Sequence, residues 1–270
     1  MKVLGLGDNV IDRYTHTGIG YPGGNALNFS VYARLLSANA AYLGVFGDDR
    51  GAEHIRRVLQ ARGVDISHCL VVAGENGHAS LTIEQGERRF LQSNAGGIRQ
   101  TTSMSFVLED IPWLRQFALI HTGAYSYADD LLPALDILPG RVSYDFSDDF
   151  VIERALPLCR HLDYGFFSCA EQSLEDTRAL LKAAQQAGCR LAIATRGAEG
   201  ALLFDGSQWL SQMPELITPV DTLGAGDAFI TAFLLAHNQG QTLAASLEQG
   251  SRFAAQICLM EGAFGEGINY

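Results

Sequence analysis

Short apolar runs alternate with helix-like segments along most of the 270-residue chain. The runs include residues 2–7 (KVLGLG), 41–47 (AYLGVFG) and 190–197 (RLAIATRG), which are too short for helices of ordinary length. Between such runs lie segments like 175–187 (EDTRALLKAAQQA), an amphipathic pattern closed by Gly188. Strands that alternate with helices predict an α/β fold, with a central, mostly parallel sheet covered by helices on both faces.

Residues 64–95 follow a different pattern, in which polar and apolar residues alternate on both sides of Gln85 and Gly86. Such alternation is typical of strands with one buried face, and the Gln-Gly pair predicts a tight turn between them. We therefore expect a small sheet that projects from the main one. The chain shows no internal repeat, and a single domain over residues 1–270 accounts for its length.

The composition favours a small-molecule substrate over a polyanion. The formal net charge is −11, whereas general affinity for nucleic acid or an anionic membrane needs clustered Lys and Arg. No apolar run is long enough to cross a bilayer. The five cysteines are scattered and lack the spacing of a zinc site, which indicates free thiols and a cytoplasmic protein.

Residues 221–227 (DTLGAGD) combine small residues and acids directly before an apolar stretch, AFITAFLLA. Because Gly224, Ala225 and Gly226 carry almost no side chain, their N–H groups can approach an anion at the start of a helix. Asp227 stands at the edge of this anion loop, where a carboxylate can take a proton from an attacking hydroxyl. The pattern predicts phosphoryl transfer to an alcohol; for so short a motif, acids that merely cap a helix are the alternative.

The longer pattern Asp-Thr-x-Gly-Ala-Gly-Asp resembles the signature of the ribokinase-like sugar kinases, also called PfkB carbohydrate kinases. The resemblance extends over essentially the whole chain and implies a ribokinase-like α/β fold. It also implies transfer of the γ-phosphoryl group of ATP, used with Mg²⁺, to a hydroxyl of a sugar or sugar-like alcohol. Asp227 would then be the base, and the N–H groups of Gly224, Ala225 and Gly226 would stabilise the transferred phosphoryl oxygens.

Two segments offer polar groups for the sugar. Asp8 and Asp12 follow the first strand, where ligands of open α/β sheets bind, and Asp12 matches the family's sugar-binding Asp. Gly24 and Asn28 match the family's Gly-Gly-x-x-x-Asn segment, and Asn25 stands where many relatives have another polar group. The two amides lie three residues apart on a helix, near one face. The structural alternatives are an Asx turn for the first segment and a glycine turn with Asn25 as N-cap for the second.

The resemblance also implies contacts to the nucleotide. Thr195, Gly197 and Gly200 match the family's Thr-x-Gly-x-x-Gly loop, and Gly226 and Ser251 are further nucleotide contacts on the same ground. Read alone, the first three residues form a plain glycine turn after a strand. For Ser251, the alternative is a purely structural role, because it belongs to a helix that packs closely through small residues.

Two acids are the metal candidates that the resemblance implies. Glu171 matches the acid that helps to hold Mg²⁺ through water, while Ser168 stands where relatives often have Asn. In the family, carbonyls near Asp221 and Leu223 and near the end of the last helix can hold a monovalent cation. Asp221 is therefore the candidate for that cation, and the need for K⁺ is left open.

In ribokinase-like enzymes, a small sheet of the expected kind forms a lid over the sugar. The resemblance therefore implies a β lid from residues 12–20 and 64–95. Such lids often pair with a second subunit, and an exposed strand edge favours a homodimer for this chain as well.

The acceptor implied by the resemblance is a fructose-amine. The short chain and the segments GDNVID, GGNALN and YDFSD are similar to family members that phosphorylate the 6-hydroxyl of compounds such as fructoselysine. Asp148, Asp149 or Glu84 could face the cationic amine. A simple ketohexose, ribose or a nucleoside is the alternative acceptor. A sugar-binding regulator without catalysis is a further alternative, against which Asp227 argues, and the missing GxGxxG after the first strand argues against a dinucleotide-dependent oxidoreductase.

Overall fold

The computed structural model describes residues 1–84 and 87–270, with side chains outside residues 83–88. Its described strands form a sheet of nine and a sheet of five. The large sheet has the order β13 (Trp209–Gln212), β12 (Ala201–Phe204), β11 (Leu191–Thr195), β10 (Tyr164–Ser168), β9 (Arg141–Asp145), β8 (Leu119–Gly123), β1 (Lys2–Gly7), β4 (Asn39–Phe46) and β5 (Leu70–Val71). From β11 to β5 all neighbours are parallel, and β12 and β13 pair antiparallel, so the predicted mostly parallel sheet is confirmed.

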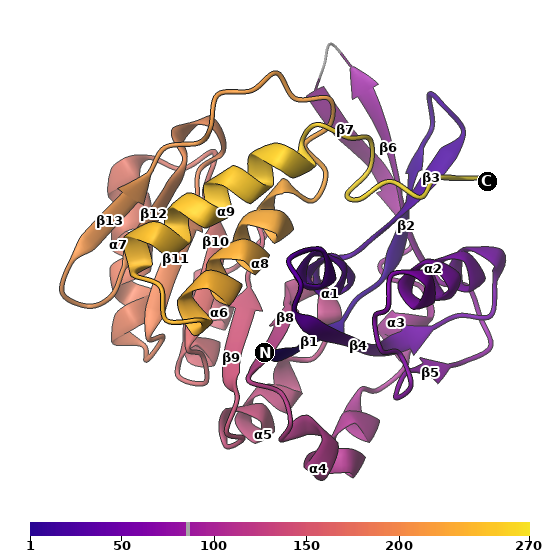
Figure 1. Ribbon diagram of the computed structural model, residues 1–270, viewed down its shortest axis with the longest axis horizontal. Helices are drawn as coiled ribbons and strands as arrows, with labels where there is room; N and C mark the ends of the chain where they lie inside the picture. Colours follow the sequence, from indigo (N-terminus) through magenta and orange to yellow (C-terminus); the bar gives the residue numbers. More distant parts are fainter. Residues whose placement is uncertain (85–86) are drawn as a thin grey trace.

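Helices cover both faces of the large sheet (Figure 1). The longer helices are α1 (Asn25–Leu35), α2 (Arg50–Ala61), α6 (Ile152–Cys159), α7 (Leu174–Gln186), α8 (Ala225–Asn238) and α9 (Leu243–Ile257). The short ones are α3 (Ile98–Thr101), α4 (Ile111–Leu114) and α5 (Leu132–Asp136), and single 3-10 turns lie at η1 (Ser105–Asp110), η2 (Ala124–Ser126), η3 (Asp129–Leu131) and η4 (Gly197–Glu199). α1, α8 and α9 lie on one face, and α6 and α7 lie on the other (Figure 1).

Buried residues of the strands alternate between two apolar cores. Val3 and Ile193 pack with Phe233 in the core beneath α1 and α8, whereas the neighbouring Leu4 packs in the core that includes Leu181 of α7. Because successive strand residues point to opposite faces, a strand covered on both sides must be apolar throughout. This requirement explains the uninterrupted apolar runs in the sequence.

The two helix types seen in the sequence follow from their surroundings. The amphipathic α7 begins at an N-cap, Ser173, whose hydroxyl accepts the N–H of Asp176 at 3.1 Å, and Gly188 with φ 116° follows its end. In α8, residues 228–236 are all buried, because the helix packs against α1 and α9. Their apolar run therefore forms a core helix that can hold its N-terminus in a fixed place.

The small sheet has the order β14 (Ile268–Asn269), β3 (Ile19–Gly23), β2 (Val10–Tyr14), β6 (Gly77–Glu84) and β7 (Glu87–Ser93). The expected range of residues 64–95 for this sheet is wrong at its start, because Leu70 and Val71 pair with β4 in the large sheet. The expected range of 12–20 is too narrow, since β2 and β3 extend over residues 10–23. The predicted turn at Gln85 and Gly86 lies outside the described residues.

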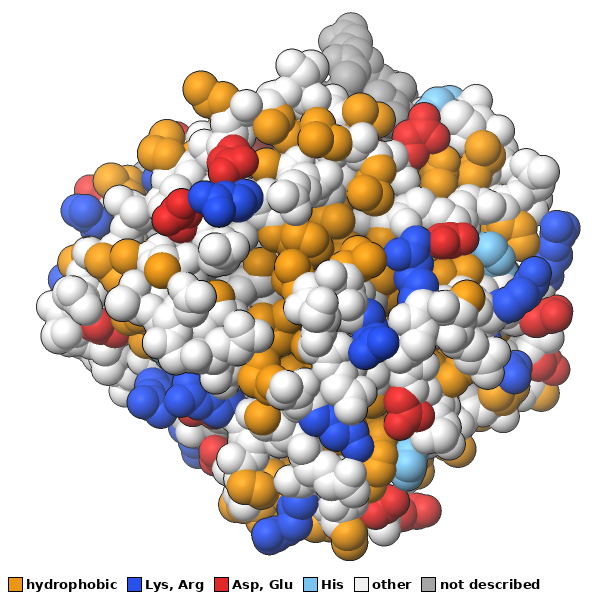
Figure 2. All heavy atoms as spheres, in the orientation of Figure 1, with side chains coloured by type: hydrophobic (Ala, Val, Ile, Leu, Met, Phe, Trp, Pro, Cys, Tyr) orange, Lys and Arg blue, Asp and Glu red, His pale blue; other side chains and the backbone are white. Residues whose placement is uncertain are grey.

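The face of the molecule seen in Figure 2 carries interspersed acidic and basic side chains rather than a broad patch of one sign. One such group joins Arg252 of α9 to Glu248 at 2.7 Å and to Glu215 at 3.4 Å. No helix in the described part of the chain combines the length and the apolar character needed to cross a membrane.

Candidate active site

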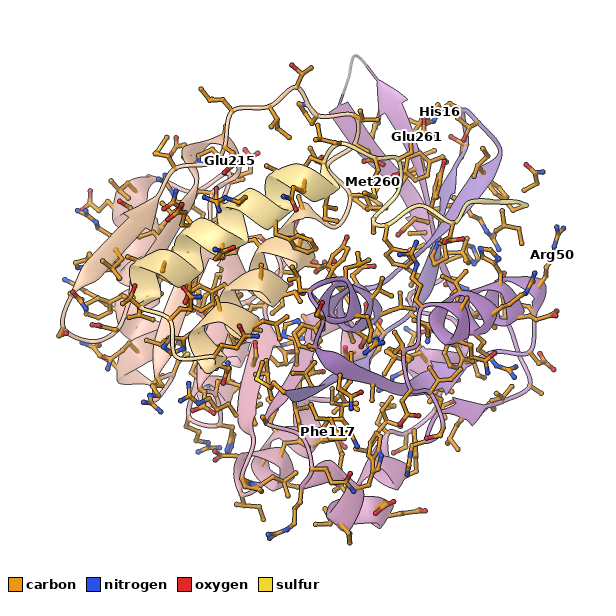
Figure 3. All side chains as sticks on the ribbon, in the orientation of Figure 1. His16, Arg50, Phe117, Glu215, Met260 and Glu261 are labelled. Atoms are coloured by element: carbon orange, nitrogen blue, oxygen red, sulfur yellow. The ribbon has the colours of Figure 1, made fainter. Side chains whose placement is uncertain are left out.

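The predicted catalytic and sugar-binding residues meet at the carboxyl-terminal edge of the large sheet. There β1 ends at Gly7, and β8 and β9 end as neighbours at Gly123 and Asp145. Figure 3 labels Phe117, which precedes β8, at the opposite edge, far from Glu261 beside the small sheet. The carboxyl-terminal edge is where open α/β sheets bind their ligands.

Asp8 holds the start of α1 in place. Its carboxylate accepts the N–H of Asn25 at 2.7 Å, the N–H of Ala26 at 3.0 Å and the hydroxyl of Ser126 at 3.0 Å. Gly24 is the N-cap, with φ 112°, and a Cβ there would lie 3.0 Å from an Asp8 carboxylate oxygen. The alternative with Asn25 as N-cap is therefore wrong: an acid that follows β1 caps the helix, and the Asn25 side chain is available for another role.

Asp227 is held by two asparagines of α1. Asn28 donates Nδ2 to Asp227 Oδ2 at 2.6 Å, and Asn25 donates Nδ2 to Asp227 Oδ1 at 2.7 Å. The two amides are three residues apart and therefore share one helix face. Since α1 packs against α8, residues predicted from two distant segments converge on one carboxylate. The carboxylate is oriented and can accept a proton from a bound hydroxyl.

Asp145, at the end of β9, is a site residue that sequence reasoning misses. Its Oδ2 accepts the same Asn25 amide at 2.9 Å, and its Oδ1 accepts the N–H of Ser147 at 2.9 Å. Burial, and after it the negative charge of Asp227, raise the pKa of Asp145 to about 7. The sequence signal that could have found it is an acid directly after an apolar strand.

The side-chain oxygens of Asn25 and Asn28 are suited to a ligand with hydroxyl groups. Both Oδ1 atoms are buried and have no hydrogen-bond partner in the described part of the chain. Buried polar atoms of proteins normally have a partner, and a hydroxyl can donate to an amide oxygen. The amides can therefore hold a polyol beside Asp227.

Asp12 lies close to the turn that leads into α1. It is buried on β2, and its Oδ2 would lie 2.2 Å from a Cβ placed on Gly23. The carboxylate is thus packed against the backbone next to Gly24. Its contact with a sugar stays a prediction.

The anion loop forms the start of α8. The helix begins at Ala225, and Gly224 at the N-cap has a left-handed φ of 74°. A Cβ on Gly224 would lie 2.3 Å from the Tyr32 hydroxyl, so the close packing requires glycine. Gly226 is exposed, and a Cβ there would meet no atom within 4 Å. The first N–H groups of a helix have no acceptor within the helix, although that of Ala225 donates to Thr222 O at 3.3 Å.

The predicted nucleotide contacts lie along the same edge or next to it. Thr195 ends β11, and Gly197 begins η4. Gly200 has φ 82°, and a Cβ there would lie 2.0 Å from a backbone oxygen of β13. The Ser251 hydroxyl on α9 donates to Met213 O at 3.1 Å, so it already has an acceptor. The nucleotide roles of these residues stay predictions.

The two metal candidates differ in their surroundings. Glu171 is exposed in the turn that follows β10, whereas Asp221 is buried and accepts several hydrogen bonds. Among the described residues, no group of three or more His, Cys, Asp or Glu side chains is placed to hold a metal ion. The contact of Glu171 with Mg²⁺ stays a prediction.

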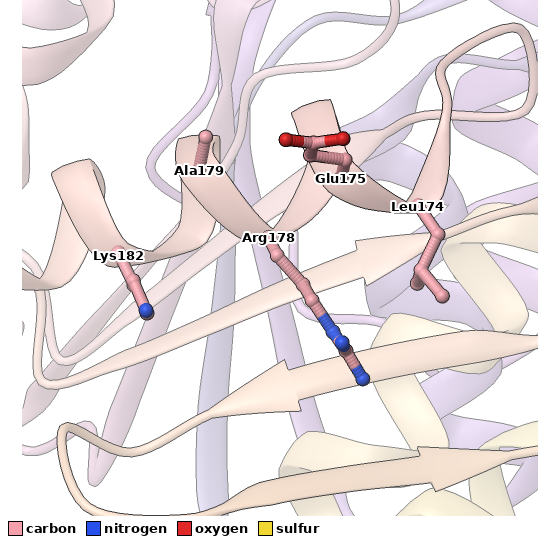
Figure 4. A pocket seen from close by; sticks show the side chains of 5 residues that line it. All are labelled: Leu174, Glu175, Arg178, Ala179 and Lys182. Atoms are coloured by element: carbon pink, nitrogen blue, oxygen red, sulfur yellow. The ribbon is translucent and has the colours of Figure 1, made fainter.

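A surface hollow lies along α7 (Figure 4). Its walls are side chains of one helix: Leu174, Glu175, Arg178, Ala179 and Lys182. The guanidinium of Arg178 lies 5.6 Å from the centre of the Trp209 ring. None of the predicted catalytic, sugar-binding, nucleotide or metal residues lines this hollow.

Comparison with known proteins identifies relatives over the full chain. The model of the pfkB carbohydrate kinase family matches residues 8–137 and 163–265. The chain is 38% identical over 272 residues to the fructosamine kinase FrlD of Bacillus subtilis strain 168, covering 100% of this chain and 95% of that protein. It is 33% identical to the fructoselysine 6-kinase of Escherichia coli K12, with 98% and 100% covered.

A solved structure of Arabidopsis thaliana ribokinase, complexed with ribose and ATP, has the same fold. Its TM-score is 0.81 at 18% identity, over 98% of this chain and 94% of that chain. The ribokinase-like fold is therefore confirmed. The chain belongs to the PfkB family of carbohydrate kinases, enzymes that phosphorylate an alcohol group.

Proposed function

We propose that this enzyme transfers the γ-phosphoryl group of ATP to the 6-hydroxyl of a fructosamine such as fructoselysine. The observation that best supports this activity is the position of the Asp227 carboxylate, which Asn25 and Asn28 hold at the start of α8. The choice of a fructosamine as the acceptor is supported by the relatives. The chain has 38% sequence identity to a fructosamine kinase and 33% to a fructoselysine 6-kinase, over nearly the whole of each chain.

In the proposed reaction, Asp227 accepts the proton of the sugar hydroxyl while the hydroxyl oxygen bonds to the γ-phosphorus of ATP. The bond from that phosphorus to the β–γ bridging oxygen breaks, and ADP leaves. Both carboxylate oxygens already accept an amide hydrogen, so the base needs little reorganisation. The N–H groups of Gly224, Ala225 and Gly226 stabilise the charge of the transferred group. Bound ATP supplies the phosphoryl group, and Mg²⁺ offsets the charge of its phosphates.

The sugar lies against the start of α1 in this proposal. The unpartnered Oδ1 atoms of Asn25 and Asn28 accept hydroxyl hydrogens, Gly24 lets the backbone approach, and Asp12 adds a carboxylate from the small sheet. Asp8 supports the site indirectly, because its oxygens hold the first N–H groups of α1.

A fructosamine differs from a plain ketohexose by its cationic amine. In this proposal, the acidic side chain of Asp148, near Asp145, faces that amine. Asp148 accepts the Ser147 hydroxyl at 3.1 Å and the Tyr125 hydroxyl at 3.4 Å. Burial raises the pKa of Tyr125, and the charge of Asp148 adds to the rise. These contacts support a negative potential that would favour an ammonium group. The side chain of Glu84 lies outside the described residues.

The nucleotide would lie along the ends of β10 and β11. We assign Thr195, Gly197, Gly200, Gly226 and Ser251 to it by family resemblance and by their place beside this edge. We assign Glu171, exposed after β10, to Mg²⁺ through water.

The assembly that we propose is a homodimer through the small sheet. β7 is an edge strand of that sheet, and its Phe90 and Leu91 are 61% and 50% exposed. An exposed apolar edge strand favours pairing with a second copy. Cys69, Cys159, Cys169 and Cys189 are free thiols, which supports a reducing, cytoplasmic location. Light scattering on a column tests the assembly, since a monomer at working concentration would contradict it.

The decisive experiment is a panel of acceptors incubated with ATP and Mg²⁺ and analysed by mass spectrometry. The panel contains fructoselysine, other fructosamines, fructose, ribose and a nucleoside. We expect phosphorylated fructosamines, with fragment ions that place the phosphate on the 6-hydroxyl. A product confined to plain hexoses would contradict the acceptor, and no product from any compound would contradict the kinase activity.

A further inference from the structure

Arg99 is a buried cation that the proposed reaction does not use. It lies on α3, shortly after β7, and among the described residues it is the one Lys or Arg that is buried, with 3% of its surface exposed. Burial lowers the pKa of Arg99, while the negative charges of Asp130 and Asp8 oppose that shift. An arginine keeps its proton in such surroundings, so a positive charge is held inside the fold.

The guanidinium of Arg99 binds the turn that follows β8. Its Nε donates to Ser126 O at 3.0 Å, and its Nη2 donates to Ser126 O at 2.6 Å and to Tyr127 O at 2.7 Å. Its Nη1 donates to Thr102 O. A guanidinium has five N–H groups, and four of them thus have a backbone acceptor. The side chain therefore fixes the backbone of the turn and is not available to a ligand.

The turn depends on this support because of its backbone conformation. Tyr127 directly follows η2 with a left-handed φ of 48°, which a residue with a side chain adopts only where its surroundings hold it. The carbonyls of Ser126 and Tyr127 both accept hydrogens from the guanidinium. The contacts with Arg99 therefore stabilise this conformation of the turn.

Ser126 connects the turn to Asp8. Its hydroxyl donates to Asp8 Oδ1 at 3.0 Å and accepts the N–H of Asp8 at 3.3 Å. A Cβ on Gly7 would lie 1.9 Å from the same hydroxyl oxygen, so the turn packs directly against the end of β1. The Asp8 carboxylate in turn accepts the N–H groups of Asn25 and Ala26. One hydroxyl therefore joins the turn to the acid that holds the start of α1.

The start of α1 is also where the proposed base is held. Asn25 and Asn28 donate to the two oxygens of Asp227 at 2.7 Å and 2.6 Å. Bonds of this length depend on the exact place of the helix, and catalytic geometry is sensitive to displacements of about 1 Å. Hydrogen bonds thus connect Arg99 with Asp227 by way of the turn and α1.

We propose that Arg99 is a positioning residue for phosphoryl transfer, which holds the Asp227 base in place through the turn after β8 and the start of α1. The guanidinium itself contacts neither the sugar nor the phosphates, because its N–H groups are bound to the backbone. The inference rests on the proposed role of Asp227 as the base but not on a particular sugar.

The first test needs no substrate. Hydrogen exchange of the Asn25 and Ala26 amides is measured by NMR, with amides of α7 as the reference for global unfolding. We expect Arg99→Met to speed exchange of the two amides about tenfold or more relative to α7. The matched control is Arg34→Met, because Arg34 binds a backbone carbonyl at the other end of α1.

The control should leave the two amides within about twofold of their wild-type exchange rates. Unchanged exchange in Arg99→Met, or an equal change in both variants, would overturn the proposal. The result does not depend on whether the chain phosphorylates a sugar, so this failure is distinct from a failure of the proposed function.

The second test separates catalysis from nucleotide binding, with an acceptor that the panel identifies. Arg99→Met is expected to lower kcat about 10- to 100-fold, because a displaced start of α1 misplaces the base in the transition state. The KM for ATP should stay within about twofold, since the residues assigned to the nucleotide lie on other elements. Arg34→Met should keep kcat within about twofold. An unchanged kcat in Arg99→Met, or a rise in the KM for ATP as large as the fall in kcat, would overturn the positioning role.

Ser126→Ala tests the same link if Arg99→Met does not fold. It removes a single hydroxyl and keeps the buried guanidinium. We expect faster exchange of the Asn25 and Ala26 amides and a kcat lowered about five- to tenfold, with an unchanged KM for ATP. A wild-type exchange rate or a wild-type kcat in Ser126→Ala would overturn the proposal.

Discussion

Asn25 donates one amide group to two carboxylates, Asp227 at 2.7 Å and Asp145 at 2.9 Å. One acid comes from the start of α8 and the other from the end of β9. The amide has two hydrogens, so each acid can receive one. Like charges so close disfavour double ionisation, which is why the charge of Asp227 contributes to the raised pKa of Asp145.

Replacement of Asp227 by asparagine removes the proposed base but keeps the size of the side chain. We expect kcat to fall about 10²- to 10⁴-fold, the usual contribution of a positioned base. Nucleotide affinity, measured by titration calorimetry, should change little because the loop backbone is retained. Full turnover in Asp227→Asn would contradict the base assignment.

Asn25→Ala removes the donor that the two acids share. Asp145 loses a stabilising hydrogen bond to its charged form, so its pKa should rise further above about 7. We expect the titration of Asp145 in carboxyl-carbon NMR to move up by about one pH unit. The matched control is Asn28→Ala, which takes a donor from Asp227 alone and should leave the titration of Asp145 unchanged in carboxyl-carbon NMR. A titration of Asp145 that moves equally in both variants would contradict the shared-donor account.

Asp145→Asn should change how stability depends on pH. The native pKa of about 7 lies above the ordinary value of 3.8, so between these values the native state binds more protons than the unfolded state. The contribution of Asp145 to stability is therefore full below pH 4 and is lost as the pH rises towards 7 and beyond. Urea unfolding from pH 5 to 8 should show Asp145→Asn gaining stability relative to wild type as the pH rises. A constant difference would contradict the raised pKa.

Two glycines of the anion loop should respond oppositely to alanine. Gly224 has a left-handed φ, and an added Cβ would lie 2.3 Å from the Tyr32 hydroxyl. We expect Gly224→Ala to lower the free energy of unfolding by about 2–4 kcal/mol. Gly226 is helical and its Cβ position is open, so Gly226→Ala should be neutral or stabilising by up to about 1 kcal/mol. Urea unfolding of both variants measures the contrast, and equal losses would contradict it.

Local chemistry predicts the parts of the site that lie within one segment. Residues 221–227 do open a helix, and Asn25 and Asn28 do share a face. Small residues before an apolar run and polar residues at helical spacing are visible in any single sequence.

The rest depends on how distant segments pack. Asp145 is visible only as an acid at the end of a strand, and its link to Asp227 exists because Asn25, at the start of α1, reaches both carboxylates. The cap of α1 comes from Asp8, 17 residues before Asn25, so a local rule points to the wrong residue. β14 and β5 have two residues each, which is too short for a periodic pattern.

The pairing of β2 with β6 in the small sheet also affects the order of folding. These parallel strands join residues 10–14 to residues 77–81, and the connection between them includes β4 and β5 of the large sheet. Closing a loop of about 60 residues costs conformational entropy. This cost is smaller once the intervening strands are in place, because they shorten the free part of the loop. We therefore expect the small sheet to assemble late and to open first in hydrogen exchange. The hydrogen bond from the hydroxyl of Tyr14, on β2, to Asp221 would then form only after the whole chain has folded.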